Sequence, residues 1–552
     1  MGKNADLVWL ALLVVGFLAL GTFFALYMVS WDAEWGFLVF GRLSLTGEVR
    51  LFQDEIVPRR LPLPFHVIGI SQLIVGPSLL AARLWSLLLG ALTVALTFVF
   101  GRSLGGRVCG FLSALFLVTH ALVVGYFAAA SYYAMSSLLI VAGLLAISRG
   151  RSLLGMMCFS LMSLNRGHLV VMVPVVLIYL LLRARDRRER IALLALTVLP
   201  PVVFLASSPE HIRILAYVPF LDRLVEPLGY RSLLVMGAED LIPTWSLAKS
   251  IVWFGKRHFF WVLATAALAG SWGISWVLRR GIREVSPPSL IVFSGILALC
   301  TMVWQVFLVH PYLKPVAAWA AAFAPLWAVV LGYAASVLLE PQRAQPVVRS
   351  AVIALLLLVF AFSPTFSRHA AMPHPLPPQE TTIGLLEEDA ERIRSIVQPG
   401  QRVFLLGSPI PAYLAGVSPY PQQITSMWML VPSEDDYAVT RSGLWGRRQV
   451  DEWLSRDAPF ALVQPAILKS LGTIESYRGL VTQIESLLER HFTLVATVGQ
   501  PPWTPSFGIY ARKRQADQGP RQLPGLDRPE WEVSGPLSPQ KWCCIFPRAR
   551  LE

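Results

Sequence analysis

Eleven apolar windows constrain the fold of this chain more than any other feature of its sequence. A run of about 20 apolar residues is long enough to cross the hydrocarbon core of a bilayer as a helix. Hydrophobic residues make up 55% of the 552 positions, far more than a soluble domain of this length needs. The windows therefore predict a mainly α, polytopic transmembrane helical bundle of about eleven spans. They lie near residues 7–29, 66–100, 107–127, 133–148, 152–164, 168–182, 190–207, 258–278, 288–309, 312–336 and 349–366.

Two of these windows differ in length from an ordinary span. The window 66–100 is expected to form one long or broken span with an amphipathic start. The window 152–164 is too short to cross a bilayer alone unless its helix is tilted or packed within the protein.

Cationic residues occur in every second loop between the windows. If the N-terminus is cytoplasmic, the loops on that side carry fifteen cationic and five acidic residues. The positive-inside rule therefore predicts a plasma (inner) membrane protein with a cytoplasmic N-terminus and an external, or periplasmic, C-terminal region. The formal net charge of +13 follows from this topology and does not indicate nucleic-acid binding.

The chain changes character after the last window. The transmembrane domain is expected to span residues 1–366, with an acidic external loop at 30–65 and a second long external loop at 208–257. Between residues 378 and 515, charged helical stretches alternate with short β-type runs, which predicts a small external α/β domain. Residues 516–552 are rich in Pro, Gly and Arg without a repeating period, so we expect a disordered tail.

An acidic stretch with the sequence SWDAEWGF follows directly on the first window, at residues 30–37. Its carboxylates, Asp32 and Glu34, stand between two tryptophans at the membrane boundary, where a lipid-linked substrate would present its head group. A carboxylate at this depth could deprotonate an acceptor hydroxyl. The same acids could equally serve only to cap a juxtamembrane helix.

Other polar side chains are expected at the same depth, at the outer ends of further spans. Arg166 or Lys314 could neutralise the phosphate of a departing lipid carrier, and either could instead only snorkel to the interface. Each of the others has a structural alternative. The histidines at 66, 168 and 310 could be structural, the pair Asp54-Glu55 could be solvated, and the tyrosines at 132 and 133 could belong to the aromatic belt. The candidate substrate-binding residues are Asp54, Glu55, Arg59, His66, Tyr132, Tyr133, Asn165, Arg166, His168, His310, Tyr312 and Lys314.

Several motifs occur in a fixed order along the chain. The acidic motif WDAEW at 31–35 is followed by the Pro-rich LPLPF at 61–65 and by ARLWSLLLG at 82–90, which has the spacing Arg-x-x-Ser-x-x-x-Gly. A basic GRSLGG turn comes next at 101–106, and HPYLKP lies late in the chain at 310–315.

In this order the motifs resemble those of the GT-C superfamily of membrane glycosyltransferases. The similarity is to the protein O-mannosyltransferase-like and aminoarabinose transferase-like branch, of glycosyltransferase family 39/83 type, and covers about residues 7–366. Two departures stand out, because the family has an adjacent Asp-Glu pair where Ala33 separates Asp32 from Glu34, and Pro311 replaces the Arg of the family's Arg-Tyr-x-x-Pro segment.

The resemblance implies an inverting transferase that takes a sugar from a polyprenyl-phosphate donor at the external membrane face. The partners would be that donor, membrane lipids, and a lipid, glycan or protein acceptor. Because Ala33 separates the two acids, either could correspond to the family's base. By its position Asp32 would be the general base, and Glu34 would orient the acceptor or hold a cation. Some members use a divalent metal ion, for which the candidate ligands are Asp32, Glu34, Asp54 and Glu55.

Three alternatives stay open at this point. A transporter or flippase of lipid-linked glycans would place ionisable residues near the middle of spans. An oligosaccharide ligase would consume a diphosphate carrier. A membrane scaffold would use its external domain only to bind a partner, and its acids would not be needed for activity.

Overall fold

The computed structural model describes most of the chain. The described residues are 3–30, 32–50, 62–166, 169–207, 211–212, 223, 226–228, 247–278, 289–304, 317–342, 344–372, 376–378, 380–424 and 429–513.

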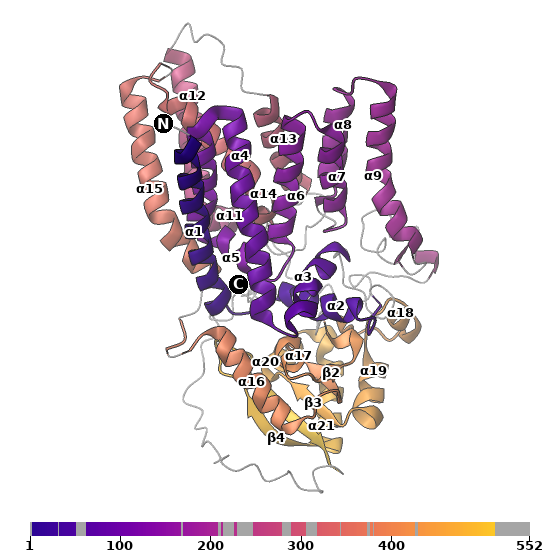
Figure 1. The fold of residues 1–552 in the computed structure, drawn as a ribbon. Helices are drawn as coiled ribbons and strands as arrows, with labels where there is room; N and C mark the ends of the chain where they lie inside the picture. Colours follow the sequence, from indigo (N-terminus) through magenta and orange to yellow (C-terminus); the bar gives the residue numbers. More distant parts are fainter. Residues whose placement is uncertain are drawn as a thin grey trace.

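Apolar helices running in alternate directions form the larger part of the protein (Figure 1). Within the described residues, five helices are long and apolar enough to cross a membrane, or six if the bent pair α5–α6 is one span. Each of the eleven predicted windows contains at least one helix, which confirms the mainly α, multi-pass membrane fold. The helices of the bundle are α1 (Lys3–Tyr27), α4 (Leu79–Thr119), α5 (Ala121–Ala128), α6 (Tyr133–Ser148), α7 (Ser152–Ser163), α8 (Met172–Leu181), α9 (Arg187–Ser207), α12 (Phe259–Leu278), α13 (Ser289–Val303), α14 (Ala317–Leu339) and α15 (Pro346–Ala371).

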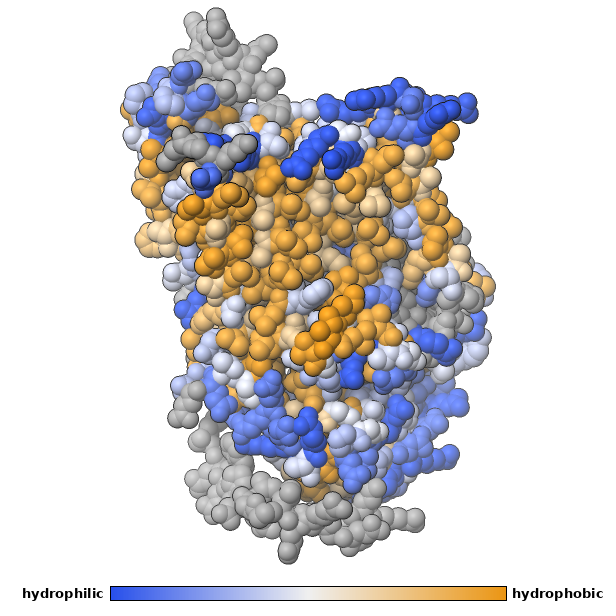
Figure 2. Space-filling model, in the orientation of Figure 1, coloured by the Kyte–Doolittle hydropathy of each residue, from blue (hydrophilic) through white to orange (hydrophobic). Residues whose placement is uncertain are grey.

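An apolar band covers the bundle on the face shown in Figure 2, with polar side chains at both ends. Such a band between two polar ends is the surface expected of a protein that crosses a bilayer.

Helix α4 is a hairpin of two helical halves. The kink lies at Gly105 and Gly106. Gly106 has a φ of 79°, a backbone angle that glycine adopts readily because it has no Cβ. The halves lie very close together, because a Cβ on Gly110 would be 2.6 Å from the Phe98 carbonyl oxygen. The chain therefore turns back in the membrane domain at the GRSLGG motif.

The predicted window 66–100 is divided into two helices. It contains α3 (Pro62–Val75) and the first half of α4, with a corner at Gly76, whose φ is 91°. The Gln72 side chain closes this corner, because it accepts a hydrogen bond from the Ser78 amide at 2.8 Å and donates one to the Ser78 carbonyl at 2.9 Å. Only the part after the corner runs along the bundle.

Two helices lie across the end of the bundle that carries the C-terminal domain (Figure 1). They are α2 (Asp32–Leu45) and α3, and they cross with their backbones in contact at Gly41 and Gly69. Part of the predicted loop 208–257 is also helical, since α11 spans Leu247–Arg257 and packs against α12 and α14.

The C-terminal part is an α/β domain, as predicted. Its five-stranded sheet has the order β2-β1-β3-β5-β4, in which β1 is parallel to β2 and β3, and β5 is antiparallel to β3 and β4. The strands are β1 (Arg402–Leu406), β2 (Ser418–Pro419), β3 (Phe460–Val463), β4 (Phe492–Val498) and β5 (Phe507–Arg512). The helices are α16 (Thr382–Ile396), α17 (Pro409–Leu414), α18 (Asp436–Arg441), α19 (Arg447–Glu452), α20 (Pro465–Gly472) and α21 (Arg478–His491), with short 3₁₀ or π turns at Pro421–Gln423, Trp453–Asp457 and Glu475–Tyr477. A further 3₁₀ turn, Glu226–Leu228, lies in the predicted loop 208–257.

The α/β domain is packed firmly against the bundle. Helix α17 contacts α2, and the Thr382 hydroxyl donates a hydrogen bond to the Tyr27 carbonyl oxygen at 2.8 Å. Ile383 and Ile410 belong to the same apolar core as the bundle helices. The domain limits 1–366 and 378–515 stay predictions, and the predicted tail 516–552 lies outside the described residues.

Candidate active site

A buried ion pair joins four elements at the α/β-domain end of the bundle. The Glu34 carboxylate accepts hydrogen bonds from Arg83 Nε at 2.9 Å and from Arg83 Nη2 at 2.8 Å. Both side chains have no exposed surface. Burying one charge alone would be costly, but here the bidentate geometry offsets much of the cost.

The remaining partners of this pair explain its position. Arg83 Nη1 donates to the carbonyls of Ala25 and Met28, both at 2.8 Å. These carbonyls lie at the end of α1, where the last turn of a helix has no intrahelical donors. Glu34 Oε1 also accepts from the Ala130 amide at 2.8 Å. The pair therefore holds together the end of α1, the start of α2, α4 and the segment after α5.

The segment between α5 and α6 is a sharp break in an apolar helix pair. The two helices are bent by 106° across residues 129–132. A break inside a membrane domain leaves backbone groups without helical partners, and such groups must be satisfied by the protein. Glu34 satisfies one of them, the Ala130 amide.

Aromatic and amide side chains surround this break. The Arg166 guanidinium lies 4.5 Å from the centre of the Tyr132 ring, and the Tyr132 and Tyr133 rings are 4.2 Å apart. The Asn165 amide nitrogen donates to the Ser136 hydroxyl of α6. The segment directly after α7, which contains Asn165 and Arg166, thus meets the start of α6.

Helix α3 also lies next to the break between α5 and α6. The Leu63 amide donates to the Leu164 carbonyl oxygen at 3.1 Å, which joins the first turn of α3 to the end of α7. The Phe37 ring of α2 lies 4.9 Å from the Phe65 ring and 6.1 Å from the Tyr132 ring. Helices α2 and α3 and the end of α7, which are far apart in the sequence, therefore converge around the break between α5 and α6.

Three buried polar atoms next to these residues have no hydrogen-bond partner in the part of the chain that the structure describes. They are Trp35 Nε1, Ser131 Oγ and Asn165 Oδ1. Unsatisfied buried polar atoms are rare in native proteins and often mark the place of a ligand or an ordered water. Their neighbours in sequence are Glu34, Ala130, Tyr132 and Arg166, so they mark the same region.

The structure brings some of the sequence-predicted residues together, and others lie outside its described part. It brings Glu34, Tyr132, Tyr133, Asn165 and Arg166 together, with His66 half-buried in the second turn of α3. Asp32 is the first residue of α2, and its side chain lies outside the described part. Seven other candidates also fall outside the described residues: Asp54, Glu55, Arg59, His168, His310, Tyr312 and Lys314.

Arg83 also belongs to this region, although no role was predicted for it from the sequence. The signal was available, because Arg83 is the only charged residue between positions 79 and 101. A charged residue inside an apolar span is expensive and is expected to have a partner in the protein.

The described residues do not form a metal site. No group of three or more His, Cys, Asp or Glu side chains in the described ranges could hold a metal ion. Glu34 accepts three hydrogen bonds from N–H donors, which occupy most of the roughly four acceptor positions of a carboxylate. Of the four acids considered as metal ligands, Asp32, Asp54 and Glu55 have side chains outside the described part.

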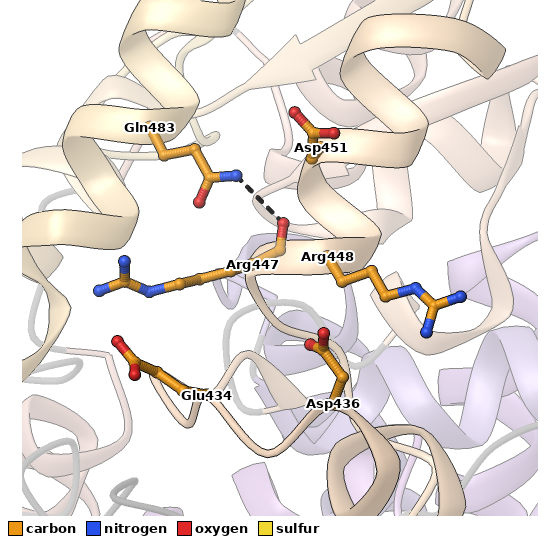
Figure 3. Close-up of a pocket in the computed structure, with 6 residues that line it drawn as sticks. All are labelled: Glu434, Asp436, Arg447, Arg448, Asp451 and Gln483. Carbon is orange, nitrogen blue, oxygen red and sulfur yellow. Dashed lines mark hydrogen bonds between the residues drawn. The ribbon is translucent and has the colours of Figure 1, made fainter.

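A hollow lies on the α/β domain, between α19, α21 and the start of α18 (Figure 3). It has a volume of about 490 Å³ and is open to solvent on one side. Its charges have both signs and point in different directions in Figure 3, so they do not converge on a single reacting atom. The residues that line it are Glu434, Asp436, Arg447, Arg448, Asp451 and Gln483.

No family model and no curated protein matches this sequence. Solved structures do match. ArnT from Cupriavidus metallidurans bound to undecaprenyl phosphate superposes with a TM-score of 0.52 at 13% identity, covering 93% of this chain and 98% of ArnT. The apo state of the same protein gives a TM-score of 0.54 at 13% identity, with 92% and 98% coverage.

An archaeal protein gives a similar result. The apo oligosaccharyltransferase of Archaeoglobus fulgidus superposes with a TM-score of 0.52 at 11% identity, covering 93% of this chain and 75% of that protein. At such low identity the likeness shows the fold alone. ArnT, an aminoarabinose transferase, and the oligosaccharyltransferase are both members of the GT-C superfamily. This chain therefore has the GT-C fold.

Proposed function

We propose that this protein is a membrane glycosyltransferase that transfers a sugar from a polyprenyl-phosphate donor to a hydroxyl of a lipid, glycan or protein acceptor. The observation that carries the proposal is the convergence of α2, α3, the α5–α6 break and the end of α7 around the buried Glu34–Arg83 pair. The likeness to ArnT, which was solved with undecaprenyl phosphate, supports the class of donor.

The reaction we propose is a single displacement. Asp32 accepts the proton of the acceptor hydroxyl, and the acceptor oxygen forms a bond with the anomeric carbon of the sugar. The bond between that carbon and the phosphate oxygen breaks on the opposite face, which inverts the configuration. The polyprenyl phosphate leaves with an additional negative charge.

Arg166 is our candidate partner for that charge. Arg166 is half-buried, and its guanidinium lies over the Tyr132 ring, which helps to hold it in place. A positioned cation that meets the developing charge on phosphate lowers the barrier. Lys314 is the second candidate for this role, and it lies outside the described residues.

The unsatisfied polar atoms could form hydrogen bonds with the hydroxyl groups of the sugar. Trp35 Nε1 can donate, Asn165 Oδ1 can accept, and Ser131 Oγ can do both. Sugar hydroxyls are also both donors and acceptors, so they could satisfy this mixed set. Glu34 then acts mainly through Arg83, by fixing the first turn of α2 two residues after Asp32.

The site faces the external side of the plasma membrane in this proposal. The α/β domain and the site lie at the same end of the bundle, and the N-terminus lies at the other end (Figure 1). The distribution of Arg and Lys supports a cytoplasmic N-terminus. A divalent metal ion held by Asp32 with Asp54 or Glu55 is compatible with this proposal, and it would supply further charge stabilisation.

The test is the release of free polyprenyl phosphate from a panel of polyprenyl-phosphate sugars, by purified protein in lipid nanodiscs with a crude membrane extract as the acceptor source. Asp32→Asn should abolish release. Glu48→Gln removes an exposed carboxylate close to the end of α2 and is the matched control, which should retain it.

The assay also separates the alternatives. Release from diphosphate carriers alone would indicate an oligosaccharide ligase. Absence of release from every donor would contradict the transferase proposal, and movement of the same lipids between vesicle leaflets would then be the activity to measure.

A further inference from the structure

A group of exposed arginines lies at the end of the bundle away from the α/β domain, in the turn that joins α8 to α9 and in the first turn of α9. Figure 2 shows hydrophilic side chains at this end, where Figure 1 places the two helix ends that the turn joins. The arginines are Arg183, Arg185, Arg187, Arg188 and Arg190.

The two acids of the same turn do not form ion pairs with these arginines. Asp186 accepts a hydrogen bond from the Glu189 amide at 2.7 Å, and Glu189 accepts one from the Arg185 amide at 2.9 Å. Both carboxylates thus serve backbone amides around the start of α9. Among the described residues, no salt bridge joins any of the five arginines to an acid. The turn therefore keeps an excess of positive charge that an anion can meet.

Arg183 differs from the other four because α8 and α13 hold its guanidinium in place. Its Cζ lies 4.9 Å from the centre of the Tyr179 ring, one turn earlier on α8. Its Nη2 donates a hydrogen bond at 3.1 Å to the hydroxyl of Ser289, the first residue of α13. A side chain that only extends to reach water needs neither contact. Arg183 is therefore a positioned fork, and such a fork suits a phosphate group.

The two helices that hold Arg183 meet next to it. The rings of Tyr179 on α8 and Phe293 on α13 are stacked, with their centres 4.1 Å apart. Helix α8 ends and α13 begins at this end of the bundle, so the two helices are antiparallel. Each residue turns a helix by about 100°, so in an antiparallel pair the residues that precede the two contacting residues lie on the same side of the contact. These residues are Ile178 and Val292.

Exposed aliphatic side chains cover this side of the contact between α8 and α13. Ile178 is 59% exposed and Val292 46%. Leu182 and Ile296, which lie one turn further along their helices, are 83% and 48% exposed. The four side chains therefore form one apolar surface that begins at the cationic turn. A phospholipid has the same arrangement, because its charged head group and its acyl chains belong to one molecule.

We propose that an anionic phospholipid binds at the seam between α8 and α13, in the leaflet away from the α/β domain. Its phosphate accepts hydrogen bonds from Arg183, and its acyl chains lie on Ile178, Leu182, Val292 and Ile296. The occupant is a lipid and not a free phosphate ion, because the apolar surface continues directly from the cationic turn. The inference does not depend on the proposed activity.

The bound lipid would support a part of the bundle that has little protein around it. Only 6% of the apolar window of α9 is buried inside the protein. The arginines of the turn belong to the start of this helix, so a head group held there would link α9 to α8 and α13.

The test measures lipid binding to the full-length protein by native mass spectrometry, after delipidation in a neutral detergent. The probes are phosphatidylglycerol, phosphatidylcholine with the same acyl chains, and inorganic phosphate. The variants are Arg183→Gln and Tyr179→Leu. Arg149→Gln is the matched control, because Arg149 is an exposed arginine in the turn between α6 and α7.

Wild type should bind phosphatidylglycerol about tenfold more tightly than phosphatidylcholine, because the excess of positive charge favours a head group with a net negative charge. Arg183→Gln should weaken the binding of phosphatidylglycerol about tenfold. Tyr179→Leu should weaken it about threefold, since the charge remains but the guanidinium loses the ring beneath it. Arg149→Gln should leave it unchanged.

Equal binding of the two lipids by wild type would overturn the proposal, and this comparison does not depend on any variant. Equal losses in Arg183→Gln and Arg149→Gln would also overturn it, because any arginine at this end would then serve. Displacement of phosphatidylglycerol by inorganic phosphate would show a site for a free anion instead of a lipid. Gel filtration identifies a variant that misfolds.

Discussion

Glu34 and Arg83 form a bidentate ion pair between the start of α2 and the start of α4, with both side chains fully buried. The residues are 49 positions apart in the sequence. Because Arg83 also binds two carbonyls at the end of α1, the pair fixes the position of the segment that contains Asp32.

Loss of either partner should destabilise the protein strongly. Arg83→Leu leaves the Glu34 carboxylate buried with the Ala130 amide as its main partner, and Glu34→Gln leaves an uncompensated guanidinium. Each change should cost about 3 to 5 kcal/mol. The measurement is thermal unfolding of the purified variants in detergent.

A double variant makes this prediction specific. Arg83→Leu combined with Glu34→Gln should cost less than the sum of the single changes, because the second change removes the charge that the first left unpaired. Arg149→Leu, at an exposed position after α6, is the control and should have little effect. Additive losses in the double variant would show that the two side chains do not act as a pair.

The sequence was sufficient to predict most of the architecture. Apolar length and the switch to short β-type runs are local signals, and strands β1, β3 and β4 lie within residues 378–515, where these runs were predicted. The corner at Gly76 also has a local signal, because Gly76-Pro77-Ser78 interrupts the apolar run of the window 66–100, which was expected to be one long or broken span.

The candidate site was harder to predict from the sequence than the fold was. Membrane topology could place Tyr132, Asn165 and Arg166 at one depth, but it could not show that the Arg166 guanidinium lies over the Tyr132 ring. The partner of Glu34 depends on how α1, α2 and α4 pack, which no local pattern encodes. The catalytic and substrate-binding roles of these residues therefore stay predictions.

The crossing of α2 and α3 should not tolerate a methyl group. A Cβ on Gly41 would lie 2.4 Å from the Phe65 carbonyl oxygen, and a Cβ on Gly69 would lie 2.3 Å from the Gly41 carbonyl oxygen. Because these neighbours are backbone atoms, the helices must move apart. Gly41→Ala and Gly69→Ala should each destabilise the protein by about 1 to 3 kcal/mol.

The same variants should lower the release of polyprenyl phosphate, since the crossing supports the segment that contains Asp32. Gly295→Ala in α13 is the matched control, because nothing lies within 4 Å of its added methyl group. It should be neutral or slightly stabilising. Wild-type thermal stability of Gly41→Ala and Gly69→Ala would contradict the close approach of the two helices.

The α/β domain should become less stable as the pH rises, through Asp389 of α16. Burial raises the pKa of Asp389 from 3.8 to about 6, although Thr504, Arg392 and the Gly499 amide act in the opposite direction. The folded protein therefore holds this proton more tightly than the unfolded chain. The stabilising contribution is complete below about pH 4 and is lost as the pH rises through about 6.

Asp389→Asn should remove this loss. Relative to wild type, the variant should be stabilised at pH 8 by at most about 3 kcal/mol, and by about half as much at pH 5. Thermal unfolding at the two pH values measures the difference. Asp451→Asn, an exposed position on α19, separates the effect of burial from the mere loss of an acid. A stability difference that does not change between pH 5 and pH 8 would contradict the prediction.

Arg166 should be needed for turnover through both its charge and its planar shape. Its guanidinium lies 4.5 Å from the centre of the Tyr132 ring, and in the proposed reaction it meets the departing phosphate. Arg166→Gln should reduce the release of polyprenyl phosphate on the order of 100-fold, because no cation then meets the developing charge. Arg166→Lys should reduce it about tenfold, since the charge remains but the stacked, bidentate fork is lost. Arg368→Gln is the control, because Arg368 also lies over an aromatic ring, at 5.2 Å from the centre of Phe23, but on α15. Equal losses for Arg166→Gln and Arg368→Gln would show that a stacked arginine is needed only for folding.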